Sequence, residues 1–388
     1  MLARVRTSRH FPHCLLSGGL LAGLAAFAQQ QAVPPPLVSP EVHPDHSVTF
    51  RLRAPNAVEV KLNLEGSQAV GMQKDDQGVW SFTTPPLEPD LYGYGFTEDG
   101  VPRLDPNNSS FKPNLLNPQN MVHVTGSSAL PWEEQDVPHG VIHHHFYRSG
   151  IVGDQRDYYV YTPPGYDEEA RSRKPYPTLY LLHGYSDDAS GWTAVGKANL
   201  ILDNLIAQGK AKPMLIVMTL GYGAPQIVAR DTAGFGAGFR DNDLRQRNLD
   251  KFRESLLSEV IPMIQSQYRV SKQRVDRAIA GLSMGGAETL YTGLNHPEIF
   301  AWIGAFSSGG LTEDFAKQFP AVDSRVNSQL KLLWIACGKD DRLIDWNRHM
   351  IGWLKTQGVN AVPVETPGTH TWMVWRRNLA DFSAQLFR

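Results

Sequence analysis

Residues 277–290 read Arg-Ala-Ile-Ala-Gly-Leu-Ser-Met-Gly-Gly-Ala-Glu-Thr-Leu, and this stretch decides the fold. An apolar, strand-forming run leads to Ser283, and a helix-forming run follows it. Gly281 and Gly285 stand two residues before and after the serine, where side chains would collide in a sharp turn between strand and helix. The stretch therefore predicts a strand, a tight turn that lifts the Ser283 hydroxyl above the end of a sheet, and a helix whose positive end faces the same space.

From Gly153 onward, short apolar runs alternate with helical runs. We expect strands at 158–162, 178–182, 215–219, 277–280, 302–306, 330–336 and 361–365, and helices that include 198–208, 252–267 and 348–356. Short apolar strands separated by helices indicate a mostly parallel sheet that is covered on both faces. Residues 151–388 are therefore predicted to form an α/β-hydrolase.

A different pattern precedes it, from about Ser39 to Val124. Apolar and polar residues alternate over candidate strands 48–53, 58–64 and 78–83, and turn residues separate these strands. Such alternation is typical of strands with one face on a core. We expect a small all-β, immunoglobulin-like sandwich at 39–124.

The first 28 residues resemble a secretory signal peptide. Arg4, Arg6 and Arg9 precede an apolar run, which ends in Ala-Phe-Ala at 26–28. The run is too short to span a membrane, so we expect removal of this segment and a secreted or periplasmic protein that is not inserted in a membrane. A Pro-rich spacer at 29–38 follows it.

Charge and cysteine content narrow the class of protein. Without the three leader arginines, the 37 basic side chains of the chain fall to 34 against 39 acidic ones, a net charge of about −5 that argues against nucleic acid as a partner. Cys14 leaves with the leader, so Cys337 stands alone at the end of an apolar run, where a buried thiol is expected.

Residues 125–150 are expected to be a connector, and they contain three adjacent histidines. In an extended segment only His143 and His145 could point to one side, and no cysteine or carboxylate is spaced nearby to complete a metal site. We therefore expect no metal there.

A serine nucleophile needs a general base and an acid that orients the base. In this fold the order along the chain is Ser, Asp or Glu, then His, and Asp341 and His370 both follow expected strands, at the edge of the sheet where Ser283 lies. We expect His370 to take the proton from Ser283 and Asp341 to fix the imidazole. Asp340 is the rival acid.

Two backbone N–H groups are candidates for the oxyanion hole. Met284 follows the nucleophile, and Tyr185 lies in the loop after an early strand, where His183 is expected to position the loop. Trp192, Trp372 and Trp375 are candidate apolar walls for an aromatic acyl group, or ordinary core residues. The Gly-rich segment 221–239 is expected to be either a mobile loop over the pocket or a tolerated surface insertion.

The catalytic half resembles the feruloyl and acetylxylan esterases of carbohydrate esterase family 1, in the esterase D-like group. The resemblance spans about residues 156–387 and rests on the motifs at 181–184, 192, 196–199, 203–207, 280–286, 336–338 and 370–375. In that family the acid is the fourth residue of a Gly-x-x-Asp turn, which implies Asp341 rather than Asp340. The resemblance also implies hydrolysis of acyl groups on plant-wall polysaccharide without metal or cofactor.

The N-terminal half resembles the early-set, family 48 carbohydrate-binding-like modules. The resemblance rests on Gly78-Val79-Trp80, Pro86-Leu87, the run at 92–96, Asp99-Gly100 and 105–107. We expect this part to pack against the active site and shape it, with Trp80 in its core. The alternative is a platform that binds glycan.

Together these patterns predict an exported serine esterase that releases ferulate or related hydroxycinnamates from xylan or its oligosaccharides. The alternatives are an acetylxylan esterase, a siderophore esterase of the enterochelin type, an acyltransferase related to the mycolyltransferases, and an exported glycan-binding protein without activity. A binding protein has no use for the complete set of Ser283, Asp341 and His370.

Overall fold

The computed structural model describes residues 36–167, 174–228 and 236–388. Leu37–Arg388 form one compact unit. The expected signal peptide and residues 29–35 of the expected spacer lie outside the described residues. Of the glycine-rich segment 221–239, the stretch 229–235 also lies outside them.

The N-terminal part, over Glu41 to Val124, contains two antiparallel sheets. In the described chain one sheet has the order β1 (Glu41–Val42), β2 (Val48–Arg53), β6 (Val79–Thr83), β5 (Gln73–Lys74). The other has the order β4 (Val70–Gly71), β3 (Val60–Leu64), β7 (Asp90–Glu98), β10 (Gln119–Val124), β9 (Phe111–Lys112), with β8 (Val101–Arg103) paired to β7. The all-β architecture expected from the alternating pattern is confirmed, although the second expected strand starts at Val60 and not at Val58.

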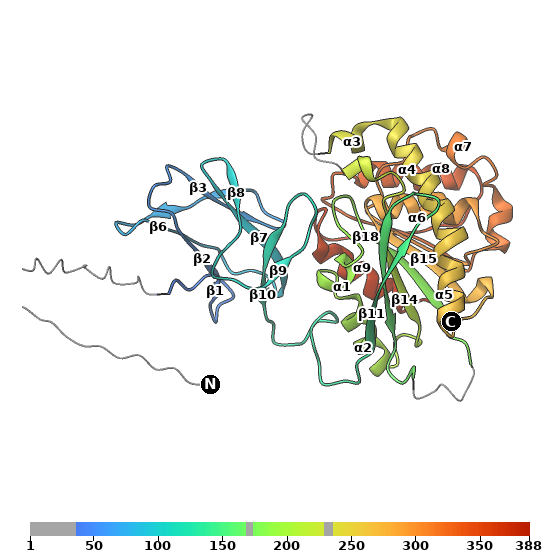
Figure 1. Cartoon of the computed structure of the whole chain (residues 1–388), viewed down its shortest axis with the longest axis horizontal. Coiled ribbons are helices and arrows are strands. Elements are labelled where there is room, and N and C mark those ends of the chain that lie inside the picture. The colour runs from blue at the N-terminus through green and yellow to red at the C-terminus, as the bar shows by residue number, and fades with distance from the viewer. Residues whose placement is uncertain (1–35, 168–173, 229–235) are drawn as a thin grey trace, which may run out of the picture. The chain divides into compact units, whose positions relative to one another are not determined.

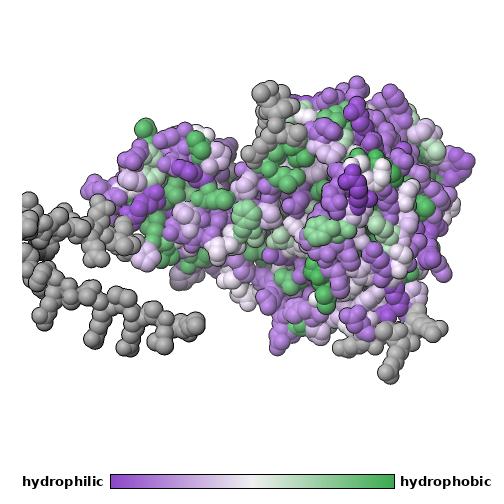
Figure 2. Space-filling view, in the orientation of Figure 1, coloured by the Kyte–Doolittle hydropathy of each residue, from purple (hydrophilic) through white to green (hydrophobic). Residues whose placement is uncertain are grey.

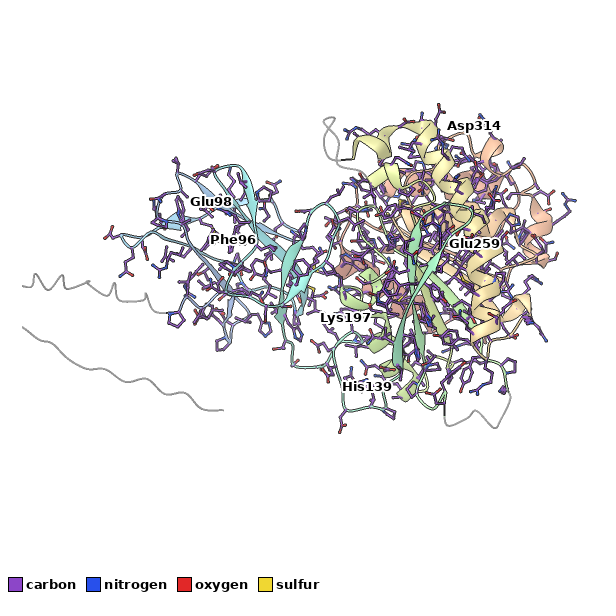
Figure 3. All side chains as sticks on the ribbon, viewed as in Figure 1. Phe96, Glu98, His139, Lys197, Glu259 and Asp314 are labelled. Atoms are coloured by element: carbon purple, nitrogen blue, oxygen red, sulfur yellow. The ribbon has the colours of Figure 1, made fainter. Side chains whose placement is uncertain are left out.

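Alternate residues of these strands form the core of the N-terminal part. Phe50 on β2 packs against Tyr94 on β7, with 4.6 Å between ring centroids, and Phe96 lies two residues further along β7, within the sheets (Figure 3). Trp80 is also in this core, only 7% exposed, and its indole N–H donates to the Ala54 carbonyl oxygen. The core role expected for Trp80 is therefore confirmed.

The C-terminal part is built on a mixed, largely parallel sheet. Among the described residues its order is β11 (Val141–Arg148), β12 (Gln155–Thr162), β14 (Leu215–Thr219), β13 (Thr178–Leu182), β15 (Arg277–Leu282), β16 (Trp302–Phe306), β17 (Leu332–Gly338), β18 (Val362–Thr366). The strands from β14 to β18 pair in parallel, and β11 and β12 run antiparallel to their neighbours. The order confirms the α/β-hydrolase architecture.

Helices cover both faces of this sheet (Figure 1). They are α1 (Gly191–Ala194), α2 (Ala198–Ala207), α3 (Ala237–Arg240), α4 (Asn242–Ser255), α5 (Ile261–Gln267), α6 (Met284–Asn295), α7 (Phe315–Gln318), α8 (Ile344–Thr356) and α9 (Trp372–Ser383). A π-helical turn, Leu256–Val260, joins α4 to α5, so the helix expected at 252–267 begins ten residues earlier.

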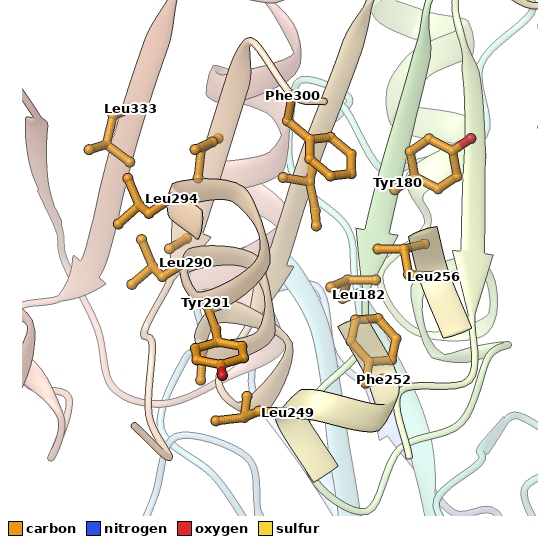
Figure 4. Packing of buried hydrophobic residues seen from close by; sticks show 14 of the residues in the cluster. Tyr180, Leu182, Leu249, Phe252, Leu256, Leu290, Tyr291, Leu294, Phe300 and Leu333 are labelled. Carbon is orange, nitrogen blue, oxygen red and sulfur yellow. The ribbon is translucent and has the colours of Figure 1, made fainter. Parts of the chain in front are cut away.

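Successive residues of the central strands enter different cores. Tyr180 and Leu182 of β13 pack with α4 and α6 in one hydrophobic cluster (Figure 4), whereas Leu179 and Leu181 pack with α2 and α9 in the other. Because both faces are buried, these strands read as continuous apolar runs in the sequence. This is why their positions could be predicted closely.

Strand β11 corrects the expected connector. Residues 141–148 were expected to be part of it, but they form the edge strand of the large sheet. The turn after β11 is held by Glu259 (labelled in Figure 3), whose carboxylate accepts hydrogen bonds from the Ser149 hydroxyl and the Gly150 N–H, both at 2.7 Å. A half-exposed edge strand with three histidines lacks the apolar run of a central strand, so the sequence pattern does not indicate it.

The histidines of β11 bind neighbouring side chains. His145 Nε2 lies 2.5 Å from the Tyr268 hydroxyl, and His144 Nε2 lies 2.8 Å from an Asp157 carboxylate oxygen. Within the described ranges, no group of three or more His, Cys, Asp or Glu side chains is arranged to hold a metal ion.

Hydrophilic residues cover most of the face seen in Figure 2, with smaller hydrophobic groups between them. No helix in the described part of the chain is long and apolar enough to cross a membrane. Cys337 is buried at the end of β17, and burial raises the pKa of its thiol to about 12, as expected for an unreactive packing residue.

Candidate active site

Ser283 lies in the turn between β15 and α6, as the sequence predicts. Its backbone has φ 52° and ψ −113°, a conformation that is rare for a residue with a side chain. A Cβ atom added at Gly281 would lie 2.4 Å from the Gly285 carbonyl oxygen, and one added at Gly285 would lie 2.5 Å from the His183 carbonyl oxygen. Both glycines are therefore required by close backbone approach, which forces the serine to the apex of the turn.

His370 links Ser283 to Asp341. Its Nε2 atom lies 3.0 Å from Ser283 Oγ, and its Nδ1 atom lies 2.8 Å from Asp341 Oδ2. Asp341 follows β17, and His370 lies between β18 and α9, so all three residues project from the carboxyl ends of the parallel strands. The structure brings together the three residues expected to form the catalytic triad.

The environment of Asp341 suits the role of an anionic partner. Its side chain is fully buried, and Oδ1 accepts the Leu343 N–H at 2.9 Å. Burial opposes ionisation of Asp341, but the hydrogen bond and charge of His370, together with further donors, outweigh it and lower its pKa. Asp340, the rival acid, is exposed, and its N–H donates to the Gly368 carbonyl oxygen.

The loop with Tyr185, one of the two expected oxyanion donors, lies against Ser283. A Cβ atom at Gly184 would be 3.4 Å from Ser283 Cβ, which places the loop next to the serine. His183 is buried, its Nε2 accepts the Gly221 N–H at 2.9 Å, and its Nδ1 donates to the Gly184 carbonyl oxygen at 2.8 Å. These bonds fix the neutral tautomer and hold the loop, which agrees with a positioning role for His183. The donor roles of Tyr185 and Met284 remain predictions.

Residues of the N-terminal part also hold this loop. The Asn114 side-chain amide donates to Asp187 Oδ1 at 2.9 Å and to Ser186 Oγ at 3.0 Å, and the Leu115 N–H donates to the Ser186 carbonyl oxygen at 2.8 Å. Asp187 is buried, and burial raises its pKa to about 7. The sequence analysis missed Asn114 and Asp187, because residues 73 positions apart carry no local signal of contact.

The three tryptophans predicted as substrate walls are packed inside the molecule. Trp192, Trp372 and Trp375 are 0%, 2% and 6% exposed, and the Trp192 indole N–H donates to the Leu182 carbonyl oxygen at 2.8 Å. Trp375 packs against the His370 ring at nearly a right angle, with centroids 4.9 Å apart. The structure therefore favours the core role that the sequence also allowed.

A small hollow lies beside the nucleophile instead. It is lined by residues from the turn Pro225–Val228, from α3, α4 and α6, and from the loop after β16, among them Ile227, Phe239, Arg245, Met284 and Gly309. Met284 follows Ser283 directly, and the Gly309 N–H donates to the Ser283 carbonyl oxygen at 3.1 Å. Phe239 also packs against Tyr185, with ring centroids 5.0 Å apart. Phe239 belongs to the described end of the glycine-rich segment 221–239.

Comparison with known proteins agrees with this geometry. The sequence profile of the family described as "Putative esterase" matches residues 149–386. The chain belongs to this esterase family. An endo-1,4-beta-xylanase/feruloyl esterase of Xylanibacter ruminicola is 31% identical over 354 residues, which cover 90% of this chain and 46% of the relative. The chain therefore spans about half the length of that relative. An acetyl esterase of Caldicellulosiruptor saccharolyticus is 23% identical over 53% of the chain and 80% of its own length.

Solved structures of esterases share the fold. The carbohydrate esterase family 1 ferulic acid esterase of Anaeromyces mucronatus, in complex with ferulic acid, has a TM-score of 0.56 at 22% identity and covers 66% of this chain and 93% of its own. The enterobactin esterase of Shigella flexneri has a TM-score of 0.64 at 18% identity, and covers 87% of this chain and 92% of its own. At these identities the likeness concerns the fold.

Proposed function

We propose that this protein is an exported serine esterase that releases ferulate or a related hydroxycinnamate from plant-wall xylan or its oligosaccharides. The observation that carries the proposal is the hydrogen-bonded chain from Ser283 through His370 to buried Asp341. The acyl group is inferred from the Xylanibacter relative, whose sequence matches nine-tenths of this chain. Export is inferred from the basic and apolar leader that ends in Ala-Phe-Ala.

Each triad residue has one task in this mechanism. His370 Nε2 accepts the hydroxyl proton as Ser283 Oγ attacks the ester carbonyl, and the imidazolium then gives that proton to the departing sugar alcohol. Asp341 holds Nδ1–H and stabilises the charged ring. Water then attacks the acyl-enzyme by the same route and releases the acid.

The oxyanion of each tetrahedral intermediate needs two donors. The N–H of Met284 begins α6, whose positive end favours negative charge at this position, and the N–H of Tyr185 is the second candidate. Phe239 and Met284 line the small hollow next to Ser283 and offer apolar surface against which the acyl group can pack. No step in this mechanism calls on a metal or cofactor.

The role of the N-terminal part follows from its contacts. Asn114 and Leu115 form hydrogen bonds with the loop that carries Tyr185, and Trp80 is buried. These contacts favour a role in shaping the active site rather than a role as a platform that binds glycan. The polysaccharide is then the substrate of Ser283 rather than a ligand of the sandwich.

Product release from three substrates tests the proposal: methyl ferulate, acetylated xylan and a catecholate siderophore ester. We expect the mature protein to release ferulate with little acetate, and Ser283→Ala to lower the rate by roughly a thousandfold or more. Unchanged turnover by Ser283→Ala would refute the esterase assignment.

The same assay decides between the alternatives. The enterobactin esterase neighbour spans both parts of this chain, so a siderophore ester is the second candidate, although fold likeness alone does not distinguish the acyl group. Preferential release of acetate or of the catecholate would keep the triad and change the substrate. No release from any of the three would favour acyl transfer or binding without catalysis.

A further inference from the structure

Helix α9 begins two residues after His370, and its own sequence does not cap it. Thr371 occupies the N-cap position, where a threonine hydroxyl commonly accepts an N–H of the first turn, but here it makes no capping bond. Its hydroxyl is buried without a hydrogen-bond partner. The first N–H groups of α9 therefore need an acceptor from elsewhere.

Glu65, in the turn that follows β3, supplies one. Its Oε1 atom accepts the Trp372 N–H at 2.9 Å, across 307 residues of sequence. Its Oε2 atom accepts the Gly93 N–H at 2.8 Å and lies 3.2 Å from Lys112 Nζ. A carboxylate at this end of a helix is also favoured by the helix dipole.

The carboxylate is held in this position by its surroundings. The Glu65 side chain is 9% exposed; burial opposes its ionisation, but Lys112, Arg376 and the two backbone donors outweigh it and lower its pKa. A Cβ atom at Gly93 would lie 2.7 Å from Lys112 Nζ and 2.9 Å from Glu65 Oε2. Gly93, inside strand β7, thus leaves the space that the ion pair occupies.

Further contacts join the same stretch to α9. Gly66 has φ 80°, and a Cβ there would lie 3.0 Å from Met373 Cε, so the turn after Glu65 packs on the second residue of the helix. Met373 also packs on the hydrophobic core of the N-terminal part. The backbone on the C-terminal side of His370 is therefore tied to the turn at Glu65.

We propose that Glu65 is a positioning residue for the general base: by anchoring the first residue of α9, it holds His370 between Ser283 and Asp341. The inference rests on the proposed triad and not on the identity of the acyl group. His370 must keep Nε2 near 3 Å from Ser283 Oγ while Nδ1 stays bonded to Asp341. If the N-terminus of α9 were released, His370, which lies two positions before Trp372, would move with it.

The test compares Glu65→Ala and Glu65→Gln with wild type on p-nitrophenyl acetate, which reports the triad without natural substrate specificity. We expect Glu65→Ala to lower kcat by about ten- to a hundredfold, the scale of a small misplacement of a catalytic group, with KM changed less than about threefold. Glu65→Gln keeps an acceptor for the Trp372 N–H but places an amide beside Lys112. Its kcat should therefore lie between those of wild type and Glu65→Ala.

Arg377→Gln is the matched control. Arg377 is 38% exposed and bonds Asp90 of the N-terminal part at 2.8 Å, so its loss removes a tie to α9 one turn further along the helix. We expect this variant to lower the melting temperature slightly and to keep kcat within about twofold. Ser283→Ala in the same assay reports whether the triad itself is correct.

Two outcomes would overturn the inference. One is a kcat for folded Glu65→Ala within twofold of wild type, and the other is an equal loss of kcat in Arg377→Gln, which would show general docking rather than positioning. Circular dichroism and thermal unfolding establish that each variant is folded at the assay temperature. If Glu65→Ala does not fold, the isosteric Glu65→Gln carries the same comparison.

Discussion

Asp187 should make the protein less stable as the pH rises. Its carboxyl is buried beside the nucleophile, and burial raises its pKa from 3.8 to about 7. A tenfold change in an acid constant corresponds to about 1.4 kcal/mol, so ionisation of Asp187 should remove at most about 4 kcal/mol from the free energy of unfolding. Asp187→Asn keeps an acceptor for the Asn114 amide and replaces the neutral acid by a neutral amide.

The sign follows from proton binding. Between about pH 4 and pH 7 the folded state holds the Asp187 proton and the unfolded state has lost it, so stability falls as pH rises through this window and then levels off. Of the total, about 2.5 kcal/mol should develop between pH 5 and pH 8. The variant should therefore match wild type near pH 4 and be more stable at pH 8.

Urea-induced unfolding at pH 5 and pH 8, followed by tryptophan fluorescence, measures this difference. Asp76→Asn, a change at an exposed aspartate, is the control and should leave the wild-type pH dependence in place. If the free energy of unfolding of Asp187→Asn changed with pH as that of wild type does between pH 5 and pH 8, the Asp187 carboxyl would be ionised in the folded state. That result would refute the reasoning from its burial.

Two further substitutions test the site. Asp341→Asn places an amide beside Nδ1 of His370 and favours the wrong tautomer of the imidazole. We expect kcat on p-nitrophenyl acetate to fall about ten-thousandfold, with little change in melting temperature. A loss of kcat below tenfold would exclude Asp341 as the triad acid. Gly285→Ala places a Cβ 2.5 Å from the His183 carbonyl oxygen, so thermal unfolding should show a free energy of unfolding lower by about 1–3 kcal/mol. Gly352→Ala on α8, where a Cβ would meet no atom within 4 Å, is the control and should not destabilise the protein. An equal loss of unfolding free energy in the two variants would contradict the packing argument.

The elements predicted best are those whose signal is local. Strand β13 and strand β14 are buried on both faces, so each reads as an unbroken apolar run, and the predicted bounds agree with the structure. The turn at Ser283 was predictable because two glycines at fixed spacing report a steric requirement. Strand β11 was missed because an edge strand needs no such run.

The order of Ser283, Asp341 and His370 along the chain, with each at the end of a strand, determined which residues meet. Parallel strands end at one edge of a sheet, so residues that follow them are brought together whatever lies between them in sequence. The sequence also allowed two roles for Trp192, Trp372 and Trp375, and only packing decided between them, because an indole is equally suited to a core and to a ligand wall.

The contacts between the N-terminal part and the site were decided by tertiary structure alone. Glu65 reaches the first residue of α9, and Asn114 reaches Asp187, across distances in sequence at which neither residue type shows a pattern. Gly93, a glycine inside a strand, is the local sign that Glu65 and Lys112 approach β7 closely. The sequence by itself thus determined the fold and predicted that Ser283, His370 and Asp341 meet, since these depend on local sterics and strand order. Which surface supports the base and the oxyanion loop depends on how two separately patterned parts of the chain pack, and that is a property of their complementary shapes and charges.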